Sequence, residues 1–256
     1  MMVSNTRKFV LTGLMTAMVF VLTFTIKIPI PFTSGYIHLG DSMIYLSVMI
    51  LGPYFGAFAA GVGSMFADLI GGYAEYALPT LIIKSLMALM MGAVLSHKKK
   101  SVTGPVLSLI AVWIAFSSAT LVYLRSQINK TGLENIASAI VGDAADHEAL
   151  QHTMDVMNRL PVYLIAGVAV VILILAAAAF FLSRRGESGI FNSKAIIGMT
   201  AAGICMVMGY FLVESFMYTP IAAACSVPMN LIQFFGGLLA AGLFAPAVSK
   251  AKEAAS

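Results

Sequence analysis

The sequence predicts an all-α integral membrane protein. Of its 256 residues, 60% are hydrophobic and 10% are charged, whereas a soluble domain carries roughly 25% charged residues. The apolar residues gather in eight segments, most of them close to the length of about 20 residues that a helix needs to cross a bilayer. The basic residues fall in the connections between these segments in the way that the positive-inside rule requires.

Eight transmembrane helices are expected in chain order. The second is short and begins in the polar approach of residues 35–40. Gly52-Pro53 separates it from the third helix, and the stretch from Gly71-Gly72 to Pro79 separates the third from the fourth, because glycine and proline interrupt helical patterns. The eight predicted helices are Phe9–Ile28, Asp41–Leu51, Tyr54–Ile70, Leu78–Leu95, Val102–Leu124, Val162–Leu182, Ala195–Tyr218 and Ala224–Val248.

The distribution of positive charge predicts the orientation. With the N-terminus in the cytoplasm, ten of the 15 Lys and Arg residues lie on the inner side, as cytoplasmic connections require. We therefore expect a multi-pass protein of a bacterial cell membrane with both termini cytoplasmic. The first helix follows a basic pair without a convincing cleavage site, so we expect a retained helix rather than a signal peptide. The ten residues are Arg7, Lys8, Lys98, Lys99, Lys100, Arg184, Arg185, Lys194, Lys250 and Lys252.

The sequence lacks the signatures of several functional classes. It contains no G-x-x-x-x-G-K-[ST] phosphate loop, so ATP hydrolysis by that route is not expected. It also has no G-x-S-x-G, H-E-x-x-H or C-x-x-C motif, and we expect neither an enzyme nor a cofactor bound by this chain. The net charge is +4, but the basic residues act as topology signals. We therefore expect the protein to contact membrane lipid and not nucleic acid. Cys205 and Cys225 lie in apolar segments and are expected to pack there.

One long polar segment, Arg125–Pro161, lies outside the membrane in this topology and is expected to form one or two short helices. Its His147 and His152 are five residues apart, which is not the i, i+4 spacing of a helical metal pair. A solvated helical face is therefore favoured over a metal site. The acidic and histidine residues of the segment are Asp143, Asp146, His147, Glu148, His152 and Asp155.

Polar side chains near the outer ends of the apolar helices predict a ligand pocket. Such groups are costly in lipid and face the protein interior, a cavity or the interface, and ligand pockets join an aromatic lining to a few polar groups. Lys84 could snorkel outward or pair with Asp68 or Glu214, and an ion pair that only locks helices together is the alternative. The candidate substrate-binding residues are Tyr36, His38, Asp41, Asp68, Tyr73, Glu75, Tyr76, Lys84, Glu214, Asn230 and Gln233.

The first helix carries small residues, Gly13 and Ala17, at a helical interval. Small residues four apart allow helices to approach closely. This stripe could pack within the bundle or face another membrane subunit.

Several motifs together resemble the substrate-binding S components of energy-coupling factor (ECF) vitamin transporters, in the riboflavin and hydroxymethylpyrimidine group. The resemblance covers Phe9–Leu95 and Ala195–Val248. It rests on GYIHLGDSMIYLSVMILGP, GAFAAGVGSMFADLIGGY, PTLIIKSLMALMMG, YFLVESFMY and SVPMNLIQ.

The resemblance implies six core helices and assembly with a transmembrane coupling subunit and two ATPase subunits, which would use the ATP. It places a vitamin near the outer face, between the loop after the first helix and the last three core helices. It also implies that Gly13 and Ala17, in place of an Ala-x-x-x-Ala motif, dock the coupling subunit.

Relative to such a core, residues 101–189 are extra. The expected division is core helices 1–4 in residues 1–100, an inserted transmembrane hairpin in 101–189 with the outer polar segment 125–161, and core helices 5–6 in 190–256. The expected function is the substrate-binding subunit of an ECF-type uptake transporter for riboflavin, hydroxymethylpyrimidine or a pyridoxine-like compound. Two alternatives are an autonomous proton-coupled transporter with Asp68, Lys84 and Glu214 as relay, and a ligand sensor or scaffold.

Overall fold

The computed structural model describes residues 5–30, 32–97, 103–142, 147–184 and 192–254, and within these ranges the chain is almost entirely helical. One small β-hairpin interrupts the helices between α1 and α2. The elements are α1 (Asn5–Thr25), β1 (Ile28–Pro29), β2 (Tyr36–Ile37), α2 (Gly40–Leu51), α3 (Pro53–Gly71), α4 (Ala74–Ser96), α5 (Thr103–Thr131), α6 (Leu133–Val141), α7 (His147–Arg184), α8 (Ser193–Met217) and α9 (Pro220–Ala254).

Seven helices among the described residues are long and apolar enough to cross a membrane: α1, α3, α4, α5, α7, α8 and α9. The eighth predicted span, Asp41–Leu51, corresponds to α2, which has 12 residues. At 1.5 Å per residue it is roughly 18 Å long, less than the roughly 30 Å of the hydrocarbon layer. The prediction of an all-α membrane protein is confirmed, and the count of eight full spans is not.

The polar segment Arg125–Pro161 is more continuous with its neighbouring spans than we expected. α5 runs to Thr131 and α7 begins at His147, so much of the segment extends these two helices beyond their apolar parts. Among the described residues of this segment, α6 is the one separate short helix.

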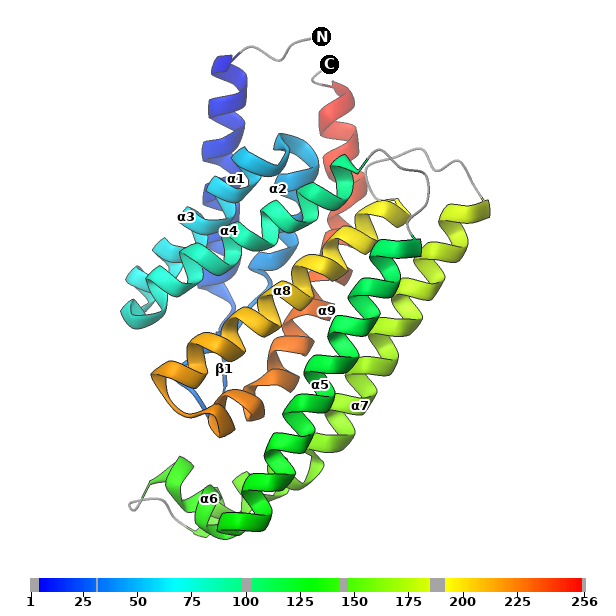
Figure 1. Ribbon diagram of the computed structural model, residues 1–256. Coiled ribbons are helices and arrows are strands. Elements are labelled where there is room, and N and C mark those ends of the chain that lie inside the picture. The colour runs from blue at the N-terminus through cyan, green and yellow to red at the C-terminus, as the bar shows by residue number, and fades with distance from the viewer. Residues whose placement is uncertain (1–4, 31, 98–102, 143–146, 185–191, 255–256) are drawn as a thin grey trace.

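The helices form two groups (Figure 1). α1, α2, α3, α4, α8 and α9 pack on one another, while α5 and α7 run side by side along α8 and α9, with α6 at their far end. Both chain termini lie at the same end of the molecule in Figure 1. The division into core and insert agrees with this packing but remains a prediction.

Two glycines allow the first three helices to pack closely. Gly52 joins α2 to α3 with a φ of 81°, which glycine adopts without the steric cost that other residues meet, and Pro53 then begins α3. A Cβ at Gly63 would meet the backbone of Thr16 and the side chain of Val19, so α1 and α3 touch here because glycine has no side chain. α3 consequently packs on both α1 and α2.

The β-hairpin positions the polar residues between α1 and α2. Ile28 pairs with Ile37 and Pro29 with Tyr36 in an antiparallel ladder. Within the turn, the Ile30 N–H donates to the Gly35 carbonyl at 2.9 Å. The hairpin thus places Tyr36 and His38 beside residues of α3, α4, α8 and α9.

Candidate functional site

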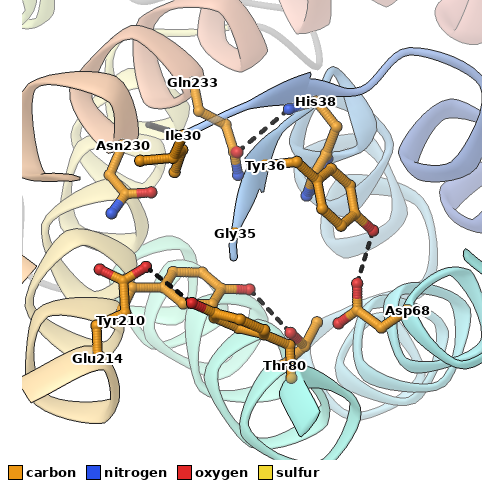
Figure 2. Close-up of a pocket in the computed structure, with 11 residues that line it drawn as sticks. Ile30, Gly35, Tyr36, His38, Asp68, Thr80, Tyr210, Glu214, Asn230 and Gln233 are labelled. Atoms are coloured by element: carbon orange, nitrogen blue, oxygen red, sulfur yellow. Dashed lines mark hydrogen bonds between the residues drawn. The ribbon is translucent and has the colours of Figure 1, made fainter. Parts of the chain in front are cut away.

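A polar cavity lies where the β-hairpin meets α3, α4, α8 and α9 (Figure 2). Its volume is about 20 Å³, roughly the space of one water molecule. Seven of the eleven predicted substrate-binding residues surround it, and their role in binding remains a prediction. The lining residues are Ile30, Gly35, Tyr36, His38, Asp68, Tyr76, Thr80, Tyr210, Glu214, Asn230 and Gln233.

Glu214 of α8 joins three elements on one side of the cavity. One carboxylate oxygen accepts hydrogen bonds from Thr33 Oγ1 at 3.3 Å and from Tyr76 Oη at 3.5 Å. The other accepts a short hydrogen bond from Ser226 of α9. Glu214 is 1% exposed, so these donors replace the water that a carboxylate needs. The acid therefore ties the hairpin, α4 and α9 together.

Asp68 of α3 lies across the cavity from Glu214 in Figure 2. Tyr36 Oη donates to Asp68 Oδ1 at 2.6 Å. Burial, with the nearby Asp68 carboxylate next in importance, raises the pKa of the Tyr36 hydroxyl well above its ordinary value. Tyr36 therefore stays protonated and remains a donor to Asp68.

The possible pairing of Lys84 with Asp68 or Glu214 is not found, and Lys84 does not snorkel to the surface. It is fully buried, and its Nζ lies 2.6 Å from Asp41 Oδ1. Gln233 Nε2 donates to the other Asp41 oxygen at 2.9 Å, and both Lys84 and Gln233 contact Met206 Sδ at 3.3 Å. The sequence placed Asp41 among the candidates but could not show that α2 brings it to α4.

Gln233 connects this ion pair to the cavity wall. Its Oε1 accepts from the His38 backbone N–H at 3.2 Å, while its Nε2 donates to Asp41. Neither Asp41 nor Lys84 lines the cavity. The pair thus supports the cavity from behind through Gln233.

His38 is held as a neutral imidazole. Burial and the positive charge of Lys84 lower its pKa to about 3, against the opposing effect of Asp41. Its Nδ1 accepts a hydrogen bond from the Gly40 N–H at 3.1 Å, which only an unprotonated nitrogen can do. His38 therefore contributes no positive charge to the cavity.

Two further candidates lie outside the lining. Glu75 is exposed in the first turn of α4, one residue before Tyr76, and the helical turn directs it away from the cavity. Tyr73 forms a second layer, with its ring centroid 4.5 Å from that of Tyr36. Neither residue is in contact with the cavity.

Besides Ile30 and Gly35, sequence analysis missed two polar lining residues, Thr80 and Tyr210. They interact with each other, with 3.1 Å between Thr80 Oγ1 and Tyr210 Oη. Helical spacing could have found them: Thr80 lies four residues after Tyr76 and Tyr210 four before Glu214, and residues four apart share a helix face.

Two polar atoms at the cavity are buried without a hydrogen-bond partner: Asn230 Nδ2 and Asp68 Oδ2. Both residues are 3% exposed and line the cavity. Buried polar groups are normally satisfied, and an unsatisfied donor or acceptor costs stability. A water molecule or a polar group of a ligand in the cavity would satisfy both atoms.

The structure brings no three His, Cys, Asp or Glu side chains together in a metal-binding arrangement within its described ranges. Of the acidic and histidine residues in the outer polar segment, Asp143 and Asp146 lie outside those ranges.

The predicted docking stripe lies on the outside of α1. Gly13 and Ala17 are both exposed, and a Cβ at Gly13 would meet no atom within 4 Å. Ala17 also lines an apolar groove of about 450 Å³ between α1, α2 and α9, together with Met18, Met43 and Phe244. Packing within the described part of the chain therefore does not require glycine at position 13.

Comparison with known proteins adds a family and one relative. The family described as "ECF-type riboflavin transporter, S component" matches residues 3–144, which is more than half of the chain. An uncharacterized protein in a gap 3' region of Pyrococcus woesei is 47% identical over 72 residues, or 28% of this chain. The chain spans about half of that relative, 48% of its length. No solved structure matches.

Proposed function

This chain belongs to the family of ECF-type riboflavin transporter S components, and on that premise we propose that it binds a water-soluble vitamin or precursor for ATP-driven uptake. The observation that carries the proposal is the cavity with Asn230 Nδ2 and Asp68 Oδ2 unpartnered. Rigid helix packing alone does not explain an unpartnered donor and an unpartnered acceptor that face the same cavity, because each unpartnered atom lowers the stability. A ligand that supplies an acceptor to Asn230 and a donor to Asp68 would satisfy both.

The charges around the cavity favour an uncharged or cationic ligand. Asp68 and Glu214 contribute carboxylates to the lining. Lys84 is held by Asp41 behind it, and His38 is neutral. A phosphate or carboxylate on the ligand would therefore lie beside two acidic side chains, in a poorly solvated site whose described lining offers no lysine or arginine to pair with it, which is unfavourable. Riboflavin, hydroxymethylpyrimidine and pyridoxine-like compounds all meet this requirement.

Ligand binding must enlarge the cavity. Pockets for small molecules usually measure roughly 300–1,000 Å³, whereas this cavity measures about 20 Å³. The hydrogen bonds from Thr33 to Glu214, at 3.3 Å, and from the Ser34 N–H to Tyr218 Oη, at 3.2 Å, hold the hairpin turn against α8. A single-ring precursor requires less rearrangement than the three-ring system of riboflavin.

Transport then depends on partner subunits. We infer that the exposed Gly13 and Ala17 stripe, with the apolar groove beside it, docks the transmembrane coupling subunit. Two ATPase subunits of the ECF module supply the energy, and the loaded S component reorients in the membrane to release its ligand inward.

The test uses the purified protein in detergent without partner subunits. A panel of water-soluble vitamins and their precursors, beginning with riboflavin, hydroxymethylpyrimidine and pyridoxine, is titrated in a thermal-shift assay, and hits are confirmed by calorimetry. A ligand at 100 times its dissociation constant stabilises the folded state by about 2.7 kcal/mol. Saturable stabilisation by one of them supports the proposal, and no stabilisation by any water-soluble vitamin or precursor overturns it.

Reconstitution separates this function from the two alternatives. A substrate-binding subunit binds ligand alone in liposomes but needs the ECF module and ATP for uptake. Uptake by the chain alone, driven by a pH gradient, would identify a proton-coupled carrier. Binding without uptake under either condition would identify a sensor.

A further inference from the structure

Lys27 occupies an unusual position between the end of α1 and the cavity. Its Nζ lies 4.4 Å from the ring centroid of Phe24 and 5.2 Å from those of both Tyr36 and Tyr73. Each distance is within the range of a cation–π interaction. Among the described residues, the ion pair joins Lys84 to Asp41 and does not include Lys27.

The Lys27 side chain is held more firmly than is usual for a lysine at the edge of a membrane. Such side chains normally extend their ammonium group into water or toward lipid headgroups, and ordering a lysine costs side-chain entropy. Lys27 is instead half-buried, and its ammonium group lies among three rings. The contacts with these rings compensate for the lost freedom.

The rings that Lys27 contacts lead directly to the cavity. Tyr36 lines the cavity and donates to Asp68 at 2.6 Å, while Tyr73 packs against Tyr36. The strand that carries Tyr36 is only two residues long, so backbone pairing alone holds it weakly. The direction of the Tyr36 ring therefore depends on its side-chain neighbours.

We propose that Lys27 is a positioning residue that fixes the Tyr36–Tyr73 wall of the cavity and thereby sets the affinity for the ligand. It acts through these two rings and does not line the cavity. This inference rests on the proposed binding function. It goes beyond that function because it assigns a role to a residue outside the lining, two positions after the end of α1.

Three variants test the proposal, with riboflavin as the probe and quenching of its fluorescence as the readout. Lys27→Met keeps an unbranched side chain and removes the charge, whereas Lys27→Arg keeps a cation that stacks on aromatic rings. Lys8→Met is the matched control, because Lys8 of α1 also makes a cation–π contact, with its Nζ 4.9 Å from the ring centroid of Phe55 on α3, and does not line the cavity.

We expect Lys27→Met to weaken riboflavin binding about tenfold, since cation–π contacts with several rings are lost. Lys27→Arg should bind within about threefold of the wild type, and Lys8→Met should bind as the wild type does. Wild-type affinity in Lys27→Met, or equal loss in Lys27→Arg and Lys27→Met, would overturn the proposal. The proposal would also be overturned if Lys27→Met weakened binding by the same factor in a Tyr36→Leu/Tyr73→Leu background as in the wild type. Lys27 would then not act through the two rings.

A ligand-free measurement separates this inference from the proposed function. If wild-type protein binds no riboflavin, the same variants are compared by thermal unfolding. Lys27→Met should then lower the melting temperature in the wild-type background and have no further effect in Tyr36→Leu/Tyr73→Leu. An equal decrease in melting temperature in both backgrounds would show that Lys27 does not position these rings.

Discussion

Lys84 of α4 and Asp41 of α2 form a fully buried ion pair, with Nζ 2.6 Å from Oδ1, directly behind the polar cavity. Removing one partner of a buried pair leaves an uncompensated charge, which is more harmful than replacing both. The pair is thus a structural support for Gln233 and, through it, for the cavity wall.

Lys84→Met should destabilise the protein by about 3–5 kcal/mol, since Asp41 is left charged and without its cation. Ligand affinity should fall as well, because Asp41 then no longer fixes Gln233. The double variant Asp41→Leu/Lys84→Met should recover most of the stability, as measured by thermal unfolding in detergent. A double variant as unstable as Lys84→Met would contradict this account of the pair.

Asn230→Leu should weaken ligand binding about tenfold, or 1.4 kcal/mol, because it removes the unpartnered donor at the cavity. Its melting temperature should stay the same or rise, since an unsatisfied buried group is lost. Ser64→Ala is the matched control: Ser64 Oγ is also buried and unpartnered but does not line the cavity. Calorimetry should find wild-type affinity in the control, and equal losses in both variants would argue against a specific role for Asn230.

The stability of the protein should decrease as the pH falls below about 6.5, in part because of His38. Its pKa is near 6.5 in the unfolded chain and about 3 in the folded one, so between these values only the unfolded state binds the proton. The loss approaches about 1.4 kcal/mol per pH unit in this window. Lys84, Asp41 and Lys27 are the charged groups that act on His38.

His38→Asn keeps an acceptor for the Gly40 N–H and removes the titration. Its unfolding free energy should therefore depend less on pH between about 6 and 3 than that of the wild type. Parallel profiles for the two proteins would show that His38 does not titrate as described.

Gly13→Leu should bind ligand normally and lose ATP-driven uptake when reconstituted with the ECF module. Its side chain has open space within the subunit, so the fold tolerates the change, whereas close helix approach by a partner does not. Gly104→Leu on α5 is the control, because a Cβ there also meets no atom within 4 Å. Normal uptake by Gly13→Leu would exclude docking at this position.

Much of the cavity was predictable because acidic and amide side chains stand out in apolar helices. Asp68, Glu214 and Asn230 stand out against their surroundings, and the topology placed all three near the same membrane surface. Thr80 and Tyr210 carry no charge and do not stand out in this way, so only their four-residue spacing from Tyr76 and Glu214 indicates that they share the same helix faces. Their contact with each other became visible in the structure.

The parts that sequence analysis missed depend on tertiary packing. Asp41 and Lys84 are 43 residues apart, and no periodicity indicates that α2 folds back onto α4. The lengths of α5 and α7 were underestimated because hydropathy marks where a helix is apolar, whereas the helix itself continues into its polar extension.

The shortness of α2 is expected to set how deep the polar cavity lies in the membrane. α2 has 12 residues and covers roughly 18 Å of a hydrocarbon layer of roughly 30 Å. We expect the β1–β2 hairpin, which precedes α2 in the chain, to occupy part of the remaining thickness. Non-helical backbone at such a depth is stable only when protein surrounds it or water reaches it. The hairpin therefore needs polar neighbours for its own peptide groups. The same neighbours create a hydrophilic recess below the membrane surface, so adding one turn to α2 would move that recess outward.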